Sequence, residues 1–283
     1  MLYTERDARR IPHFLYGTAW KESETQRLVE LALKQGFRGI DTANQRRHYD
    51  EAAVGEAIFR CIQKGILKRE ELFLQTKFTF LRGQDHRLPY ERNASVSTQV
   101  EQSFSSSLEH LQTNYIDSYV LHGPSSHKGL TSADWEAWQS MEALKDKGLV
   151  RFLGISNVNF EQLQELSQNV RIRPDFVQNR CYATLGWDSA IRKFCESNQI
   201  FYQGFSLLTA NPEVMNHPKL AQIASRYKRT TIQIIFRFSL EVGMILLTGT
   251  TNAKHMQEDL AIFDFQLTSE EIRQIQTQNK PYT

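Results

Sequence analysis

The sequence predicts an α/β protein, a single (β/α)8 TIM barrel with a C-terminal helical tail that spans residues 1–283. Eight short apolar runs alternate with amphipathic stretches of helical period. No Pro/Gly-rich linker divides the chain, and one barrel commonly fills about 200–250 residues or more. These observations favour one closed barrel over an open sheet or two domains.

The candidate strands are rich in β-branched or aromatic residues and are apolar at successive positions. This pattern is typical of parallel strands that are covered on both faces. The eight candidate strands are residues 14–18, 39–42, 72–77, 118–122, 152–156, 176–179, 201–205 and 245–248.

The stretches between the strands predict helices, because apolar residues recur at helical spacing. Two clear apolar faces are formed by Val96, Val100, Phe104 and Leu108, and by Ile232, Ile235 and Phe236. The expected helix starts and ends are capping boxes of Ser23 with Gln26 and of Asn159 with Gln162, and the glycines Gly36 and Gly148. A last helix is expected after Thr268, with Ile272 and Ile275 packed against the barrel.

Composition limits the classes of partner and location. The 34 basic and 32 acidic residues are interspersed, so nucleic acid is not an expected partner. Cys61, Cys181 and Cys195 lack metal-ligand spacing and are expected to be buried free thiols. The first ten residues are charged where a signal peptide is apolar, and no apolar run approaches the ~18 residues of a membrane span. We expect a cytoplasmic, monomeric protein without a metal site or a membrane partner.

Polar side chains end several of the predicted strands. These ends are occupied by Asp41, Lys77, His122, Ser156 with Asn157, and Gln178 with Asn179. Because a barrel collects its catalytic groups from the carboxyl ends of its strands, these residues are expected to meet around one substrate. The loops 80–93 and 123–133 follow strands and are the expected walls of the pocket.

Ordered motifs over most of the chain resemble the aldo-keto reductase family. They are GTAW at 17–20, GIDTA at 39–43, YDEAAVGEAI at 49–58, LFLQTKF at 72–78, IDSYVLHGP at 116–124, KGLVRFLGISN at 147–157, DFVQN at 175–179 and QGFSLL at 203–208. The resemblance implies an enzyme that reduces aldehydes or ketones to alcohols with a nicotinamide cofactor.

The resemblance also implies a catalytic tetrad of Asp41, Tyr49, Lys77 and His122. Tyr49 is expected to donate a proton to the carbonyl oxygen. Lys77, held by Asp41, is expected to lower the pKa of Tyr49, and His122 to orient the carbonyl or help donate the proton. In the family pattern the tyrosine follows the DTA aspartate by about five residues, whereas Arg46 stands there in this chain. Tyr49 is the tyrosine of this lengthened loop, and if it points away, His48 or His122 is the alternative acid.

Residues at the other strand ends match those that hold the cofactor in the family. Ser156, Asn157 and Gln178 are implied to bind the carboxamide and Phe205 to stack on the nicotinamide. The segment Ser206, Leu207 and Leu208 would follow the pyrophosphate, and Gly17, Thr18, Ala19 and Trp20 would close the near side.

The adenosine end departs from the family pattern. Gly249 replaces a lysine, and His255 stands in for an arginine. Thr250, Asn252 and His255 are expected to contact a 2′-phosphate, with Glu258 and Asp259 near adenine or simply solvated. NADP is therefore expected as the cofactor, and NAD remains an alternative.

Trp20, His122 and the two long loops are expected to line an aromatic substrate pocket with few fixed charges. Two other functions stay open from the sequence. The chain could be a regulatory subunit that binds cofactor with little turnover, given the lengthened loop, or an aldolase with Lys77 as a Schiff-base nucleophile.

Overall fold

The computed structural model describes residues 3–6 and 9–277 of the chain. Eight parallel strands form a closed barrel in the order β10-β3-β4-β5-β6-β7-β8-β9, and the two remaining strands, β1 and β2, form an antiparallel hairpin. The predicted (β/α)8 barrel is confirmed. The strands are β1 (Tyr3–Arg6), β2 (Arg9–Pro12), β3 (Phe14–Gly17), β4 (Gly39–Asp41), β5 (Phe73–Phe78), β6 (Ile116–Leu121), β7 (Val150–Ser156), β8 (Phe176–Arg180), β9 (Phe201–Phe205) and β10 (Met244–Thr248).

Helices follow the barrel strands, as the alternating pattern predicts. The α-helices are α1 (Thr25–Gln35), α2 (Glu51–Gln63), α3 (Val96–His110), α4 (Ser132–Asp146), α5 (Phe160–Asn169), α6 (Ser189–Ser197), α7 (Pro212–Met215), α8 (Pro218–Tyr227), α9 (Thr231–Glu241), α10 (Ala253–Leu260) and α11 (Ser269–Thr277). Short 3-10 helices are η1 (Glu22–Glu24), η2 (Arg69–Glu71), η3 (Leu81–Gly83), η4 (Ala183–Leu185) and η5 (Ala261–Asp264).

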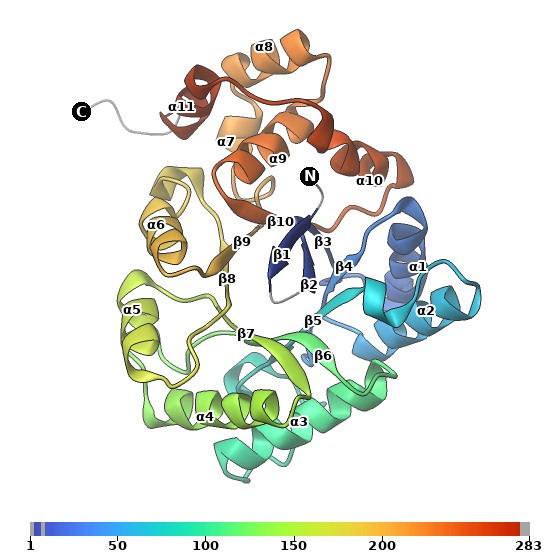
Figure 1. The fold of residues 1–283 in the computed structure, drawn as a ribbon, viewed down its shortest axis with the longest axis vertical. Helices are drawn as coiled ribbons and strands as arrows, with labels where there is room; N and C mark the ends of the chain where they lie inside the picture. The colour runs from blue at the N-terminus through green and yellow to red at the C-terminus, as the bar shows by residue number, and fades with distance from the viewer. Residues whose placement is uncertain (1–2, 7–8, 278–283) are drawn as a thin grey trace. The chain divides into compact units, whose positions relative to one another are not determined.

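Contacts divide the chain into two compact units, Tyr16–Val177 and Met1–Leu15 with Gln178–Thr283. In the first unit, α1 to α5 lie outside the strands β4 to β7 (Figure 1). Those strands are buried on both faces, which explains why apolar residues occupy successive positions in parts of each strand. That the whole chain behaves as one domain stays a prediction.

The first unit has a core between strands and helices. Val100 and Phe104 of α3 are buried, as their four-residue spacing predicts, and Trp138 of α4 is fully buried with its indole N–H bonded to the Ile172 carbonyl at 3.0 Å. The Asn159–Gln162 capping box and the left-handed Gly36 helix end are confirmed. The Ser23 cap is wrong, because residues Glu22–Glu24 form η1 and α1 begins at Thr25.

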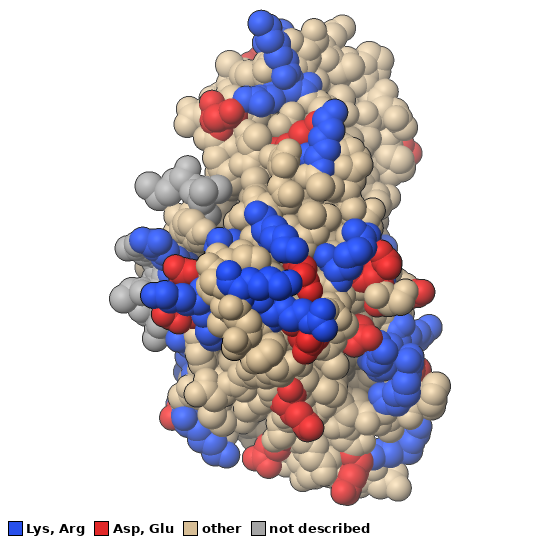
Figure 2. Space-filling view, turned by 90° about the vertical axis from the view of Figure 1, so that its right-hand side faces the viewer, with Lys and Arg blue, Asp and Glu red and all other residues tan. Residues whose placement is uncertain are grey.

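In the second unit, Ile235 and Phe236 of α9 and Ile275 of α11 are buried, as predicted, whereas Ile232 and Ile272 on the same predicted faces are partly exposed. The three thiols, Cys61 in the first unit and Cys181 and Cys195 in the second, are free and buried, as expected. Among the described residues, no helix is both long enough and apolar enough to cross a membrane. On the face shown in Figure 2, basic and acidic side chains are intermixed.

Candidate active site

The ends of four neighbouring strands in the first unit supply the predicted reactive side chains. Asp41 ends β4, Lys77 lies at the end of β5, and Ser156 ends β7. His122 directly follows β6, and its N–H donates to the Phe78 carbonyl at 2.9 Å. Because these strands are parallel, their carboxyl ends meet on the same side of the sheet.

Lys77 and Asp41 form a buried ion pair beneath the cavity. The Lys77 Nζ lies 2.6 Å from Asp41 Oδ1 and 2.8 Å from the Thr42 carbonyl. Gln75 donates to the same carboxylate oxygen at 2.7 Å, and Ser118 donates to Gln75 at 2.8 Å. The pair is therefore held by a polar network that satisfies its buried atoms, as a desolvated charge pair requires. Sequence reasoning missed Gln75 and Ser118, although both alternate inward on predicted strands.

Tyr49 reaches the same place despite the lengthened loop. A turn closes from the Tyr49 N–H to the Gln45 carbonyl at 3.0 Å, and Asp50 then caps α2 by accepting from the Ala53 N–H at 3.1 Å. Arg46, which stands where the family pattern has tyrosine, pairs with Asp50 at 2.8 Å. The loop thus folds its extra residues outward and delivers the Tyr49 ring to the cavity.

The Tyr49 ring lies next to the two other predicted groups. Its centroid is 5.9 Å from that of His122, in an edge-on arrangement, and 5.4 Å from Lys77 Nζ. The structure therefore brings Asp41, Tyr49, Lys77 and His122 together.

The protonation states differ in one respect from the sequence expectation. Burial raises the pKa of Tyr49, and the Asp41 carboxylate raises it further. The expected lowering by Lys77 is not seen, because burial and the Asp41 carboxylate both act in the opposite direction. Burial lowers the pKa of Lys77, while Asp41 acts in the opposite direction. Burial and then the Lys77 charge hold the pKa of His122 well below its usual range, so its imidazole is neutral.

His122 has a partner that sequence reasoning missed. Its Nδ1 lies 2.7 Å from Thr79 Oγ1, and its carbonyl accepts from the Asn157 side chain at 2.7 Å. Thr79 follows Lys77 by two positions at the end of β5, so strand alternation places both on one face and is the signal that points to Thr79.

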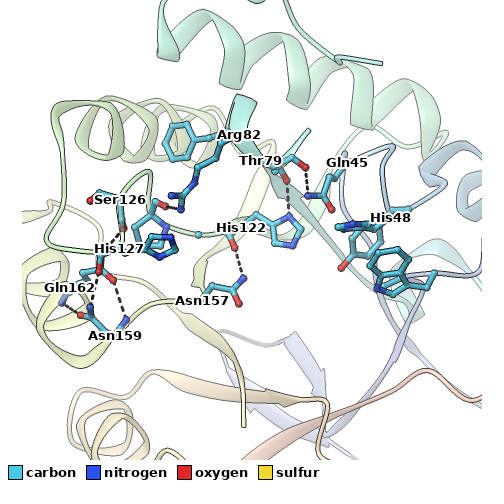
Figure 3. Close-up of a pocket in the computed structure, with 17 residues that line it drawn as sticks. Gln45, His48, Thr79, Arg82, His122, Ser126, His127, Asn157, Asn159 and Gln162 are labelled. Atoms are coloured by element: carbon cyan, nitrogen blue, oxygen red, sulfur yellow. Dashed lines mark hydrogen bonds between the residues drawn. The ribbon is translucent and has the colours of Figure 1, made fainter. Parts of the chain in front are cut away.

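Tyr49 and His122 line a cavity of about 570 Å³. Figure 3 shows His122 among the other residues that line it. Both predicted loops line it: one through Phe80, Arg82 and Gly83, and the other through Gly123, Pro124, Ser126 and His127. Trp20 is 68% exposed and stacks on His48 with ring centroids 3.9 Å apart. The lining is more polar than the expected aromatic pocket. Its polar and cationic members are Gln45, His48, Tyr49, Thr79, Arg82, His122, Ser126, His127, Asn157, Asn159 and Gln162.

The remaining candidates of the first unit lie around this cavity or beneath it. Ala19 lines the cavity, and Gly17 ends β3. Thr18 is buried, and its hydroxyl donates to the Asp41 carbonyl at 3.0 Å. Asn157 has a positive φ of 52°, and its side chain reaches Ser156 Oγ at 3.1 Å.

In the second unit, the nicotinamide and pyrophosphate candidates lie in β8, at the end of β9 and directly after it. Gln178 is buried, and its amide donates to Gln203 at 2.9 Å. Phe205 ends β9 and is followed by Ser206, whose φ is 56°. After them come Leu207, which is buried, and Leu208, which is partly exposed.

The adenosine candidates lie at the start of α10 and along it. Asn252 caps α10 by accepting from the Lys254 N–H at 2.8 Å, and Thr250 Oγ1 is 3.5 Å from His255 Nδ1. Glu258 is partly exposed. Asp259 is not a solvated acid: it is buried, it accepts from the Thr248 hydroxyl at 2.9 Å, and burial raises its pKa to about 7.

Comparison with known proteins agrees with this arrangement. The chain is 32% identical over 294 residues to the aldo-keto reductase AKR2E4 of Bombyx mori, covering 97% of this chain and 91% of that protein. It is 31% identical over 258 residues to the uncharacterized oxidoreductase YtbE of Bacillus subtilis strain 168, covering 91% and 85%. The crystal structure of the Bombyx mori AKR2E4 in complex with NADP superposes with a TM-score of 0.80 at 28% identity, covering 98% of this chain and 92% of that chain.

The profile of the Aldo/keto reductase family matches residues 14–280, which is nearly the whole chain. The chain therefore belongs to the aldo/keto reductase family and is a nicotinamide-dependent carbonyl oxidoreductase.

Proposed function

We propose that this chain reduces an aldehyde or ketone to the alcohol with NADPH, and that Tyr49 is the proton donor. The observation that supports this proposal is that Tyr49 and His122 line one cavity, with the buried Lys77–Asp41 pair next to the Tyr49 ring. A raised pKa keeps the Tyr49 hydroxyl protonated at neutral pH, which is the state that a general acid needs.

Each side chain has a distinct task in this mechanism. The Tyr49 hydroxyl donates its proton to the carbonyl oxygen as negative charge develops there. The neutral His122 imidazole orients that oxygen, and the buried Lys77 ammonium stabilises the phenolate that remains. Asp41 keeps Lys77 in place.

The residues present fit NADP. The exposed start of α10, with Thr250, Asn252 and His255, offers hydroxyl, amide and helix N-terminal donors that suit a phosphate. No arginine stands among these candidates, so the preference for NADP over NAD rests on neutral donors and His255. When bound, the cofactor supplies the hydride. The nicotinamide would be held by Ser156, Asn157, Gln178 and Phe205. The pyrophosphate would be held by Ser206, Leu207 and Leu208. The near side of the cofactor site would be closed by Gly17, Thr18, Ala19 and Trp20.

The alternatives find no support. Lys77 is fully buried, is paired with Asp41 and is absent from the cavity lining, so it is poorly placed to form a Schiff base. A regulatory subunit without turnover has no need of a proton donor delivered to the cavity. We also propose that the protein is cytoplasmic, because its three buried thiols are free, as in a reducing compartment. A monomer stays our proposal for the oligomeric state.

The test is Tyr49→Phe, assayed by NADPH absorbance against a panel of aldehydes and ketones. We expect kcat to fall about 100-fold or more, since a general acid contributes on the order of 10²–10⁴-fold. NADPH affinity should stay unchanged. Tyr115→Phe is the matched control, because the Tyr115 ring is held between Arg69 and Arg151 and is absent from the cavity lining. Comparable turnover by Tyr49→Phe would assign the acid to His48 or His122 instead.

A further inference from the structure

The cavity beside Tyr49 has a lining of one charge sign. Within the described part of the chain, no aspartate or glutamate is among its lining residues, which include Arg82 and the histidines His48, His122 and His127. His122 is neutral, and burial lowers the pKa of His48. Arg82 is therefore the fixed charge of the lining, and it lies on η3 in the loop that follows β5.

The guanidinium of Arg82 has donors to spare. It donates to the Pro124 carbonyl of the facing loop, and within residues 3–6 and 9–277 no ion pair joins it to a carboxylate. The nearby acid of its own loop, Asp85, is paired with Arg87 instead. Because a guanidinium carries five N–H donors in a planar fork, several remain for a ligand.

The loop 123–133, which faces Arg82, directs no carboxylate into the cavity. The Asp134 carboxylate accepts from the Ser125 N–H at 2.6 Å, the Ser125 hydroxyl at 2.7 Å and the Thr131 N–H at 2.7 Å. The Asp134 carboxylate oxygens are thus occupied by hydrogen bonds to the loop that they hold in place.

Amide side chains hold the same loop from the other side. Gln162 donates to the carbonyls of Ser126 at 3.0 Å and Gly129 at 2.8 Å, and Asn157 donates to the His122 carbonyl at 2.7 Å. Figure 3 shows Arg82 and His127 on one side of His122, with His48 on the other. The loop whose Pro124 carbonyl accepts from Arg82 is therefore held in place before a substrate arrives, which spares a ligand the cost of ordering that loop.

We propose that Arg82 forms an anion subsite, which selects aldehydes or ketones that carry a carboxylate at the end away from the carbonyl. This inference rests on the proposed function, because it assumes that the carbonyl itself lies at Tyr49 and His122. A planar guanidinium binds a carboxylate through two parallel hydrogen bonds, and the absence of lining acids removes the repulsion that an anionic substrate would otherwise meet.

The test compares each of two aldehyde acids with its methyl ester, using succinic semialdehyde and terephthalaldehydic acid to sample two spacings. For the acid with the better spacing, we expect kcat/KM to exceed that of its ester by about 10-fold or more, as for a charge-assisted hydrogen bond. Arg82→Gln should bring this ratio close to unity, because it removes the charge that distinguishes each acid from its ester. Arg92→Gln is the matched control, because Arg92 is exposed and does not line the cavity. Esters that match both acids in the wild type, or a ratio that survives Arg82→Gln, would overturn the subsite.

A second measurement separates this inference from the proposed function. Calorimetry of benzoate and benzamide binding to the NADPH complex needs no turnover, and benzoate should bind about 10-fold more tightly in the wild type but not in Arg82→Gln. If no carbonyl is reduced while this difference holds, the subsite stands and the proposed function fails. If Arg82→Gln instead weakens NADPH binding and leaves benzoate unaffected, the anion at Arg82 is a cofactor phosphate and the inference is wrong.

Discussion

Thr79 controls how the imidazole of His122 is presented to the substrate. Its hydroxyl is 2.7 Å from Nδ1, and the low pKa of His122 leaves a single proton on the ring. If the threonine donates to Nδ1, that proton is on Nε2, where it can be donated to a carbonyl oxygen. Thr79 is thus a positioning residue that acts through His122.

We predict that Thr79→Val lowers kcat by about 5- to 10-fold with little change in the Kd of NADPH, because it removes one hydrogen bond of about 1 kcal/mol but keeps the side-chain shape. Nitrogen NMR of the His122 ring should show the two tautomers mixed in the variant and one tautomer in the wild type. Thr79→Ser should restore both kcat and the spectrum. An unchanged spectrum in Thr79→Val would remove the positioning role.

Site residues at strand ends and site residues on loops differ in how far they could be predicted from the sequence. Asp41, Lys77, His122 and Ser156 follow from the strand pattern alone, because the carboxyl ends of parallel strands meet. Arg82 could not be predicted in this way. Its position depends on how two loops close over the cavity, and loop composition does not determine loop shape.

At the scale of elements, the strands that are buried on both faces were the predictable ones. All eight barrel strands fall on the expected runs, within two residues at each end. The hairpin of β1 and β2 was missed, because the segments YTER and RRIP are largely charged and offer no apolar run. The Ser23 cap failed because η1 occupies the chain before α1 and satisfies its own turn.

The helices α2 and α3 approach each other closely at Gly55. A Cβ on Gly55 would lie 2.0 Å from the His110 carbonyl oxygen and 2.8 Å from the Leu111 Cα. Both are backbone atoms, so no side-chain rotation can relieve the contact. Only glycine lets these two helices pack at this distance, and α2 begins two residues after Tyr49.

We predict that Gly55→Ala destabilises the protein by about 1–3 kcal/mol, the usual cost of overpacking. The sign of the change in the free energy of unfolding is informative, because the same substitution in an uncrowded helix is stabilising by about 1 kcal/mol. Urea unfolding measures the effect, and Ala52→Gly at an exposed position of α2 calibrates helix propensity alone. A Gly55→Ala protein that is as stable as the wild type would show that α2 and α3 can separate without cost.

At the scale of the whole molecule, the cysteines report on whether the chain unfolds as one domain. Cys61 belongs to the unit Tyr16–Val177, whereas Cys195 belongs to the other. Both are buried, and burial raises the pKa of Cys61 and brings that of Cys195 to about 12, so neither thiol reacts before its surroundings open. Each thiol therefore measures the opening of its own unit.

We predict that both thiols share one free energy of opening. In a closed barrel every strand has two neighbours, so opening either unit would leave strand edges of the other unpaired. Labelling with iodoacetamide at increasing urea, followed by mass spectrometry of the two peptides, gives the two opening energies separately. Equal values that match global unfolding, measured by circular dichroism, are expected of one cooperative domain. If Cys195 instead became reactive at urea concentrations that leave Cys61 protected, the two compact units would be separate folding domains, and the prediction of a single domain would be wrong.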